Sequence, residues 1–407
     1  MKILILAQHY APEEVSGAVL ASELAESFTN LGHKVTLITS PPNYPHGKVF
    51  KGYKNKLFFS KEINNNIVVV RVWNYITSKK NITDRLLNWV TLSISAIIAG
   101  LFIEKPDVIL SFSPPITLGI TSLLLKYYWK VPWLFRLEDL YPDAAISAGK
   151  LKNKTVINLS KFIEKWIYDK ADLIGVISEG FCDILIKKGI STNKIKIINL
   201  WSDPDLIKPA PKNEDLLQIY NLQNETIFLY SGNIGETSSI EDLLYLSNKL
   251  KGHNDVKFLI IGEGVKKNIV KDFIGSNKLQ NVILLPYQPR ETYKKFLSIS
   301  DFGVVSINNN SSPFSLPSKI FNIMASGKPV FALAPRDSEI TKLIKEGDFG
   351  VSFAHDELNL AINYILNIDR NKTEKMGINA RKFLLDNFSR DISVRNFEKH
   401  LNDLLRR

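Results

Sequence analysis

Short apolar runs alternate with amphipathic stretches along the first half of the chain. The apolar runs are nearly continuous and occupy residues 2–7, 34–39, 67–73, 107–112, 131–136, 172–178 and 194–199. Helical patterns separate them; residues 19–31, for example, repeat leucine and phenylalanine at helical spacing. Strands that are apolar on both faces and joined by helices are typical of a parallel sheet that helices cover on both sides. The first half therefore predicts a doubly wound α/β domain.

The second half repeats this plan. Its apolar runs cover residues 226–232, 256–264, 281–286, 301–307 and 329–334, again with helical patterns between them. The intervening stretch 201–215 has three prolines and mixed charge, as linkers often do. We therefore expect two Rossmann-like parallel-sheet domains, residues 1–205 and 206–388, which face each other across a cleft with ligands at the carboxyl ends of the strands. A final helix, 389–407, is expected to return to the first domain.

Several function classes lack their usual sequence signals. The loop after the first strand, AQHYAPEEVSGA, is too long and too poor in glycine for the GxGxxG fingerprint, which argues against a dinucleotide-dependent oxidoreductase. The single cysteine, Cys182, excludes a disulfide framework, and the six histidines show no metal-ligand spacing. We therefore expect neither a metal nor a cofactor. The opening residues MKILILAQHY are typical of a strand rather than a signal peptide, so we expect a cytoplasmic protein.

The segment 308–335 carries the strongest functional signal. It runs from small and polar residues into LPSK at 316–319, where proline and Ser318 favour a helix start with Lys319 in the first turn. Unpaired N–H groups at a helix N-terminus and an adjacent ammonium suit a diphosphate. The segment therefore predicts a diphosphate site. An ordinary strand-loop-helix with a solvent-facing lysine is the alternative interpretation.

Other positions in the second half add candidates for the donor side. The loop after the strand 226–232 precedes a helix, so it is a second place for a diphosphate. Its candidate residues are Ser231, Gly232, Asn233 and Gly235. Glu263, in IGEG, and Arg290, in PYQPRE, are candidates for the nucleoside side, although either could be an ordinary surface charge.

In the first half, candidates lie next to the expected strand ends. Gly17 comes just before the first helix, where a glycine lets a phosphate or a sugar approach the backbone; a plain turn is the alternative. Glu138 and Asp139 follow the strand 131–136, at the edge of the sheet where such folds keep their chemistry. They would orient the acceptor or hold the transferred sugar, or else cap a helix or pair with Arg136.

The loop PPNYPHG, at 41–47, is the expected contact with the acceptor. Three prolines make it stiff, which suits a positioning role. Asn43, Tyr44 and His46 are its candidate acceptor-binding residues. A purely structural corner is the alternative.

Charge and hydropathy raise the question of a membrane. The net charge is +11, and the stretch from Lys48 to Lys80 holds eight basic residues and one acid. No nucleic-acid-binding motif accompanies this stretch, so an anionic membrane surface is the expected partner rather than nucleic acid. Residues 86–103 contain eighteen positions without a charge, but polar residues dilute them and a strand follows directly. We therefore predict a buried domain helix rather than a span, with peripheral attachment to the inner face of the membrane.

A series of motifs along the chain resembles those of a known protein family. KILIL, YAPEEVSGA, LAESFTNLGHKVTLIT, KPDVIL, ADLIGVIS, SGNIG, IGEG and ASGKPVFA occur in this order over nearly the whole chain, which resembles family 4 of the GT-B retaining glycosyltransferases. PPNYPHGKVF, EDLYPD, YSGNIGE and LPSKIFNIMASGKPV narrow the resemblance to the WbuB/WcaI-like subgroup of bacterial O-antigen, capsule and exopolysaccharide transferases. The resemblance implies transfer of a sugar, with N-acetyl-L-fucosamine as the best candidate, from a UDP-linked donor to a lipid-linked saccharide acceptor.

Within that resemblance, Glu138, Asp139 and Lys319 are the expected catalytic residues. Many members carry a Glu-x7-Glu pair whose second glutamate holds the donor ribose; here the matching positions are Phe314 and Asn322, so Asn322 is at most a partial replacement. No DxD-like acidic pair lies on an expected donor loop, which predicts activity without a metal. A GT-B-type UDP-sugar 2-epimerase and a non-catalytic sugar-nucleotide binding protein remain as alternative functions.

Overall fold

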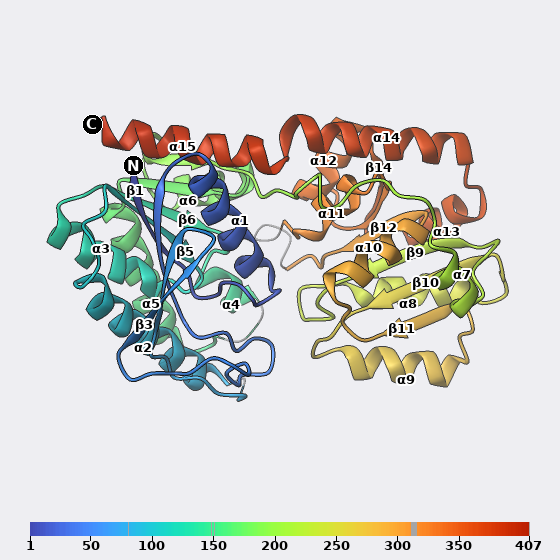
Figure 1. Cartoon of the computed structure of the whole chain (residues 1–407). Helices are drawn as coiled ribbons and strands as arrows, with labels where there is room; N and C mark the ends of the chain where they lie inside the picture. The colour runs from blue at the N-terminus through green and yellow to red at the C-terminus, as the bar shows by residue number, and fades with distance from the viewer. Residues whose placement is uncertain (80, 148, 150, 311–315, 407) are drawn as a thin grey trace. The chain divides into compact units, whose positions relative to one another are not determined.

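The chain forms two compact units (Figure 1). The computed structural model describes residues 1–407 except 80, 148, 150, 311–315 and 407, so Phe314 lies outside the described residues. The first unit contains Met1–Asn199 and Val394–Arg407, and the second contains Leu200–Ser393. The first unit thus ends a few residues before the expected boundary at 205, and it resumes a few residues after 389.

A doubly wound sheet forms the centre of the first unit, with the strand order β3-β4-β2-β1-β5-β6-β7-β8. Its strands are β1 (Lys2–Leu6), β2 (Lys34–Thr39), β3 (Phe59–Asn64), β4 (Ile67–Val72), β5 (Val108–Ser113), β6 (Trp133–Leu137), β7 (Leu173–Val176) and β8 (Ile195–Ile197). Every described pair is parallel except β3 with β4. The predicted parallel sheet is confirmed, and β5 and β6 are buried throughout because helices cover both faces.

The sequence did not predict β3, an edge strand. It pairs antiparallel with β4 through a tight turn at Asn65 and Asn66, whose φ angles are 49° and 64°. Asparagine tolerates this left-handed conformation, which hairpin turns require. Because β3 is half-exposed or exposed along its length, its residues FSKEIN lack the apolar run that marks the buried strands.

Helices flank this sheet. They are α1 (Ser16–Asn30), α2 (Ile82–Gly100), α3 (Thr117–Trp129), α4 (Asp143–Ser147), α5 (Lys154–Lys170), α6 (Glu179–Lys187), the 3-10 turn η1 (Thr192–Lys194) and the last helix, α15 (Arg390–Leu405). From Val394 onward α15 belongs to the first unit. The Phe397 ring lies 6.5 Å from the Phe28 ring, and Glu398 accepts a hydrogen bond of 2.8 Å from His33. These contacts fasten the end of the chain to α1 and the turn that follows it.

The predicted burial of the helix at 86–103 is wrong. α2 buries Trp89, Leu92 and Ala96, but the opposite side of the helix is exposed and equally apolar. By length and composition alone, α2 would suffice to cross a membrane. Only 28% of an apolar 18-residue stretch of this helix is buried in the protein. Beyond Arg85 the outer face of α2 carries no charge, which removes the periodic signal that distinguishes a surface helix from a core helix.

The second unit has its own sheet, in the order β11-β10-β9-β12-β13-β14, and its described pairs are all parallel. Its strands are β9 (Thr226–Ser231), β10 (Val256–Ile261), β11 (Val282–Leu285), β12 (Phe302–Ser306), β13 (Val330–Leu333) and β14 (Gly350–Phe353). Its helices are α7 (Glu214–Tyr220), α8 (Ile240–Lys249), α9 (Lys267–Asn277), α10 (Arg290–Ile299), α11 (Lys319–Ala325), α12 (Glu339–Gly347), α13 (Leu358–Leu366) and α14 (Arg370–Asn387). Phenylalanine rings fill the core, with Phe228 stacked on Phe302 at 5.0 Å.

In both sheets the winding direction reverses beside the first strand. β1 lies between β2 and β5, and β9 lies between β10 and β12. In doubly wound folds, ligands bind at such a reversal, beyond the carboxyl ends of the strands. The chain emerging from β1, the chain emerging from β9 and the start of α11 therefore lie where ligands are expected in each unit.

Candidate functional site

Lys319 lies at the reversal point of the second sheet. Its ammonium nitrogen is 3.6 Å from the centre of the Tyr230 ring, at the end of β9. A Cβ added to Gly232 would lie 3.2 Å from both Cε and Nζ of Lys319, so a side chain there would crowd the lysine. Gly232 also has a φ of 147°, which few residues other than glycine adopt. The structure therefore brings Lys319 and the loop after β9 together.

The Lys319 ammonium is a cation without a counter-ion. Among the described residues no carboxylate pairs with it, and the Tyr230 ring is its recorded partner. Burial lowers the pKa of Lys319 from 10.5 to about 7, because loss of water disfavours the charged form. An anion placed next to this nitrogen would restore the charge and raise the pKa. A phosphate group fits that requirement.

The glycines of IGEG hold the loop after β9 in place. A Cβ on Gly262 would collide with the carbonyl oxygen of Gly232, and one on Gly264 would collide with the carbonyl oxygen of Ile234. The Ile234 amide donates to the Glu263 carbonyl at 2.8 Å. IGEG is too short to be a complete GxGxxG nucleotide fingerprint. Its role is instead to let two backbone segments touch.

Not every amide of this loop is free for a diphosphate. The Gly232 amide donates to the Ile261 carbonyl at 2.9 Å, as part of the sheet edge. Within the described part of the chain, the amides of Asn233 and Gly235 have no acceptor. Of the candidate loop, the amides of Gly232 and Ile234 are therefore engaged by the protein, and those of Asn233 and Gly235 are available.

The helix that follows Lys319 adds little of its own. α11 has seven residues, and Ser318 precedes it without a side-chain cap. A short helix contributes a weak dipole, so the charge at this point comes mainly from the Lys319 side chain. Ser231 is the last residue of strand β9.

The other donor-side candidates are engaged by protein groups or lie on elements other than α11. Glu263 accepts a hydrogen bond of 2.5 Å from Lys267 and is exposed, and Arg290 begins α10. The Asn322 oxygen accepts a hydrogen bond of 2.8 Å from the Ser202 hydroxyl. Burial raises the pKa of Tyr293, and a hydrogen bond from Asn322 opposes that shift. The oxygen of the Asn322 amide is therefore already engaged by the protein.

Two carboxylates mark the carboxyl end of the first sheet. Glu138 follows β6, and burial raises its pKa to about 7, partly offset by Arg136. Its Oε1 has no hydrogen-bond partner among the described residues, and its Oε2 would lie 3.6 Å from a Cβ added to Gly17. Burial also raises the pKa of Asp139 to about 6. The structure thus brings Gly17 and Glu138 together, with an unpaired carboxylate between α1 and β6.

The sequence left open that Glu138 pairs with Arg136, and the structure supports this alternative only in part. Arg136 is fully buried, and its Nη1 donates to the carbonyl oxygens of Val176, at 3.1 Å, and Ile198. Burial lowers the pKa of Arg136 to about 10, while the charge of Glu138 opposes the shift. No direct ion pair joins the two among the recorded contacts of the described residues. Arg136 therefore anchors neighbouring strands and biases Glu138 toward its ionised form.

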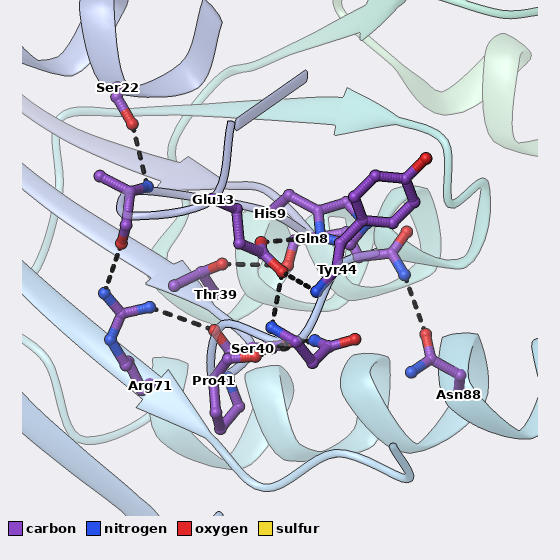
Figure 2. Close-up of polar contacts among 12 residues, drawn as sticks. Gln8, His9, Glu13, Ser22, Thr39, Ser40, Pro41, Tyr44, Arg71 and Asn88 are labelled. Atoms are coloured by element: carbon purple, nitrogen blue, oxygen red, sulfur yellow. Dashed lines mark hydrogen bonds and ion pairs between the residues drawn. The ribbon is translucent and has the colours of Figure 1, made fainter. Parts of the chain in front are cut away.

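The sequence missed Glu13, which organises the expected acceptor loop. The Glu13 carboxylate accepts the amides of Asn43 and Tyr44, both at 2.7 Å, and a hydrogen bond of 2.9 Å from His9. Figure 2 shows Glu13 between His9 and Tyr44. Burial raises the pKa of Glu13, but His9 and the two amides outweigh it, so the net pKa is lowered. Arg71 of β4 stabilises the same region by donating to the Ala11 carbonyl at 2.7 Å. The sequence feature that could have indicated this role is a carboxylate, Glu13, in the loop after the first strand.

The three acceptor-loop candidates differ in their surroundings. The Asn43 amide donates to the Pro41 carbonyl at 2.8 Å, so its side chain shapes the loop. Tyr44 is 47% exposed, and its ring meets the His9 ring edge-on at 5.8 Å. His46 lines a solvent-open hollow of about 820 Å³ with Lys48, Lys51 and Ser78 among its neighbours. Tyr44 and His46 are thus accessible to a ligand, whereas Asn43 is held by the loop.

Both halves of the chain match models of glycosyltransferase families. Residues 17–206 match the model "Glycosyltransferase Family 4", and residues 212–383 match "Glycosyl transferases group 1".

The chain is a GT-B glycosyltransferase.

This glycosyltransferase is similar to "Putative colanic acid biosynthesis glycosyl transferase WcaI" of Escherichia coli, at 26% identity over 84% of this chain and 86% of that protein. It is also similar to "Probable glycosyltransferase WbjE" of Pseudomonas aeruginosa, at 25% identity over 74% of this chain and 76% of the relative. The resemblance seen in the motifs is thereby confirmed at the level of the GT-B glycosyltransferases.

Solved structures of the same fold cover this glycosyltransferase almost completely. Sucrose-phosphate synthase of Thermosynechococcus elongatus has a TM-score of 0.79 at 16% identity, over 99% of both chains. Anabaena Alr3699/HepE in complex with UDP-glucose has a TM-score of 0.72 at 16% identity, over 99% of this chain and 100% of that chain. At such identities these likenesses concern the fold.

Proposed function

We propose that this glycosyltransferase moves a sugar from a UDP-linked donor to a lipid-linked saccharide in the synthesis of a bacterial surface polysaccharide. N-acetyl-L-fucosamine or another N-acetylamino sugar is the proposed sugar, and the anomeric configuration is retained. The relative named for colanic acid biosynthesis supports a polysaccharide product. The fold neighbour bound to UDP-glucose supports a UDP donor.

The observation that carries the proposal is the uncompensated Lys319 ammonium beside Gly232. In glycosyl transfer the nucleoside diphosphate leaves with its charge, so a cation in a desolvated position stabilises the transition state. The unengaged amides of Asn233 and Gly235 offer further donors to the same diphosphate. Because protein groups meet that charge, the proposed reaction needs no metal.

We assign the acceptor side to the first unit. Glu138 has a pKa near neutrality and an unpaired oxygen, so it is suited to accept a hydrogen bond or a proton from a sugar hydroxyl. Asp139 adds a second carboxylate, and Tyr44 and His46 offer exposed polar groups on a loop that Glu13 holds. No residue of this set is arranged as a covalent nucleophile, which is consistent with attack on the face that the leaving group vacates.

The test is a reaction of the purified protein with UDP-, GDP- and dTDP-linked sugars and a lipid-diphosphate GlcNAc acceptor. The proposal requires an extended saccharide product that depends on a UDP-sugar and on the acceptor. A changed nucleotide sugar formed without acceptor would identify an epimerase. Binding without any turnover would identify a sugar-nucleotide binding protein.

Chelation tests the metal-independent part. Turnover should persist in EDTA, because the Lys319 ammonium rather than a metal ion neutralises the diphosphate in this proposal. A loss of more than about tenfold that magnesium restores would overturn this part of the proposal. The donor preference from the first test would still stand in that case.

A further inference from the structure

The outer side of α2 is an apolar stripe. Its exposed side chains recur about every four residues, which places them on one face of the helix. They are Leu86, Leu87, Val90, Ile94 and Ile98, followed by Leu101 and Phe102 just beyond the helix, with exposures from 38% to 65%. No charged residue interrupts the chain between Arg85 and Glu104. The helix is about 28 Å long at 1.5 Å per residue, so the stripe is far longer than a single exposed leucine would be.

Two neighbouring helices extend this surface. α3 packs on α2, with Trp129 donating to the Gly100 carbonyl at 3.1 Å, and a Cβ on Gly119 of α3 would meet Ile167 of α5. These helices lie side by side in the first unit (Figure 1). Their exposed apolar side chains are Leu124, Tyr127 and Tyr128 on α3, and Val156, Leu159, Phe162 and Trp166 on α5. We call these residues and the α2 stripe the helical apolar face.

The charges on the same elements are arranged to leave a positive excess. Glu104, Asp169 and the half-buried Asp172 pair with Lys2 at 2.5 Å, Lys165 at 3.3 Å and Lys126 at 2.7 Å. The exposed Asp107 accepts the Lys2 amide at 2.6 Å. Exposed lysines on or next to these helices have no carboxylate partner among the described residues. They are Lys105, Lys130, Lys152, Lys154, Lys161 and Lys170.

We propose that the helical apolar face rests on an anionic lipid bilayer, with its apolar side chains in the interface and its lysines against the lipid phosphates. Contiguous exposed apolar surface marks an interaction site, and tyrosine and tryptophan favour the membrane interface. A second copy of the chain is a poorer occupant, because a symmetric dimer would set the unpaired lysines of both copies against each other. Trp89 and Leu92 fasten the inner side of α2 to the unit, so the helix lies along the membrane instead of crossing it.

This surface differs from the one expected from the sequence. The basic stretch Lys48–Lys80 led us to expect an electrostatic patch, and Lys80 lies outside the described residues. On the helical apolar face, insertion of side chains provides the larger part of the binding, and the lysines add to it. The inference is independent of the proposed donor and acceptor, because it concerns the protein without substrates.

Flotation of the purified protein with vesicles tests the proposal. The probes are vesicles of phosphatidylcholine alone and vesicles with added phosphatidylglycerol. The protein should bind the anionic vesicles best and retain measurable binding at high salt, because burial of apolar side chains is not screened. No binding to anionic vesicles, or binding that high salt abolishes completely, would overturn it.

A triple variant with Val90→Glu, Ile94→Glu and Ile98→Glu should lower the partition coefficient at least about tenfold, since three charges would enter the interface. The matched control carries Ile219→Glu, Val265→Glu and Ile269→Glu in the second unit, where exposure is 66%, 64% and 54%, and should bind like the wild type. Circular dichroism checks that both variants fold. Equal losses in the two variants would contradict the proposal.

Two further measurements separate lipid from protein partners. Lys154→Ala with Lys161→Ala should lower binding to anionic vesicles by about fivefold per lysine at low salt and have little effect at high salt. Phe162→Glu alone, on α5, should also weaken binding, which covers the case in which the α2 triple variant does not fold. Sedimentation of the wild-type protein without lipid should show a monomer. A dimer that dissociates in the α2 triple variant would assign the helical apolar face to a second copy instead.

Discussion

The second unit holds a half-buried lysine without a counter-ion at the carboxyl end of its sheet, whereas the first unit holds half-buried carboxylates at the corresponding end of its own. Burial lowers the pKa of Lys319 to about 7, and it raises the pKa of Glu138 to about 7 and that of Asp139 to about 6. Within the described residues none of the three has an ion-pair partner. Each unit therefore bears the cost of an unpaired group where its fold binds ligands.

Two other half-buried lysines in the same units have partners. Lys188 pairs with Asp143 and with Glu164 in the first unit. Lys328, at the other end of α11 from Lys319, donates to the Ser298 carbonyl at 3.0 Å and feels the charge of Asp301. Burial lowers the pKa of both Lys319 and Lys328. The absence of an internal partner, rather than burial, is what distinguishes the candidate site from a structural group.

The largest expected effect comes from Lys319→Ala. A charge-assisted hydrogen bond to the diphosphate contributes roughly 1.5–3 kcal/mol, so kcat/KM should fall at least about tenfold, with a loss in kcat as the leaving group gathers charge. Lys319→Arg should restore only part of the rate, because a planar guanidinium differs in shape from an ammonium.

Lys328→Ala is the matched control for that variant. It should lower the melting temperature, because the Ser298 carbonyl loses its donor, while kcat/KM stays close to the wild type. Wild-type kinetics in Lys319→Ala, or equal kinetic losses in both variants, would remove the distinction between the two lysines.

A pH series sharpens the same comparison. On the proposed function we expect UDP to bind the charged form of Lys319, whose pKa in the free protein is about 7. Its affinity should then fall by up to about tenfold per pH unit from pH 7 to 9. The slope should vanish in Lys319→Ala. The contribution of this lysine to folding stability has the opposite sign: its folded pKa lies below the usual 10.5, the unfolded chain binds more protons in that window, and stability rises with pH. Titration calorimetry and thermal melts separate the two effects.

A smaller effect is expected from Gly17→Ala in the first unit. The added methyl would stand 3.6 Å from Glu138 Oε2, which is ordinary contact, so the fold should persist while ligand access to that oxygen narrows. Turnover should fall several-fold up to about tenfold. Gly275→Ala is the control, because that helical glycine has open space around it and lies in α9. Similar kinetics for the two variants would argue against a ligand next to Glu138.

Glu13→Ala should have the smallest effect on turnover, because it acts through the acceptor loop. Loss of the carboxylate leaves the amides of Asn43 and Tyr44 without an acceptor and should destabilise the unit by roughly 1–3 kcal/mol. The KM for the acceptor should rise while donor affinity stays unchanged. Glu14→Ala, at an exposed neighbouring position, should change neither quantity. A change in donor affinity in Glu13→Ala would place this network on the wrong side of the reaction.

Local patterns determined the architecture of both units. Runs such as 107–112 and 301–307 became the buried strands β5 and β12, because a parallel strand that is covered on both faces must be apolar on both. LPSK at 316–319 led correctly to Lys319 at the start of a helix, because proline and serine act on the backbone next to them. These features depend on neighbours in the chain, so the sequence by itself determined them.

The tertiary structure decided which side chains pair with one another and which are exposed to solvent. Only the packing of β9 beside β10 and β12 places Tyr230 under Lys319 and the IGEG glycines against Gly232. Asn322 matched a ribose-binding position in sequence, yet Ser202 holds its amide oxygen. The apolar composition of α2 was visible, but which of its faces is covered depends on α3 and the sheet. Burial and pairing are sums over residues far apart in the chain, so no local pattern contains them.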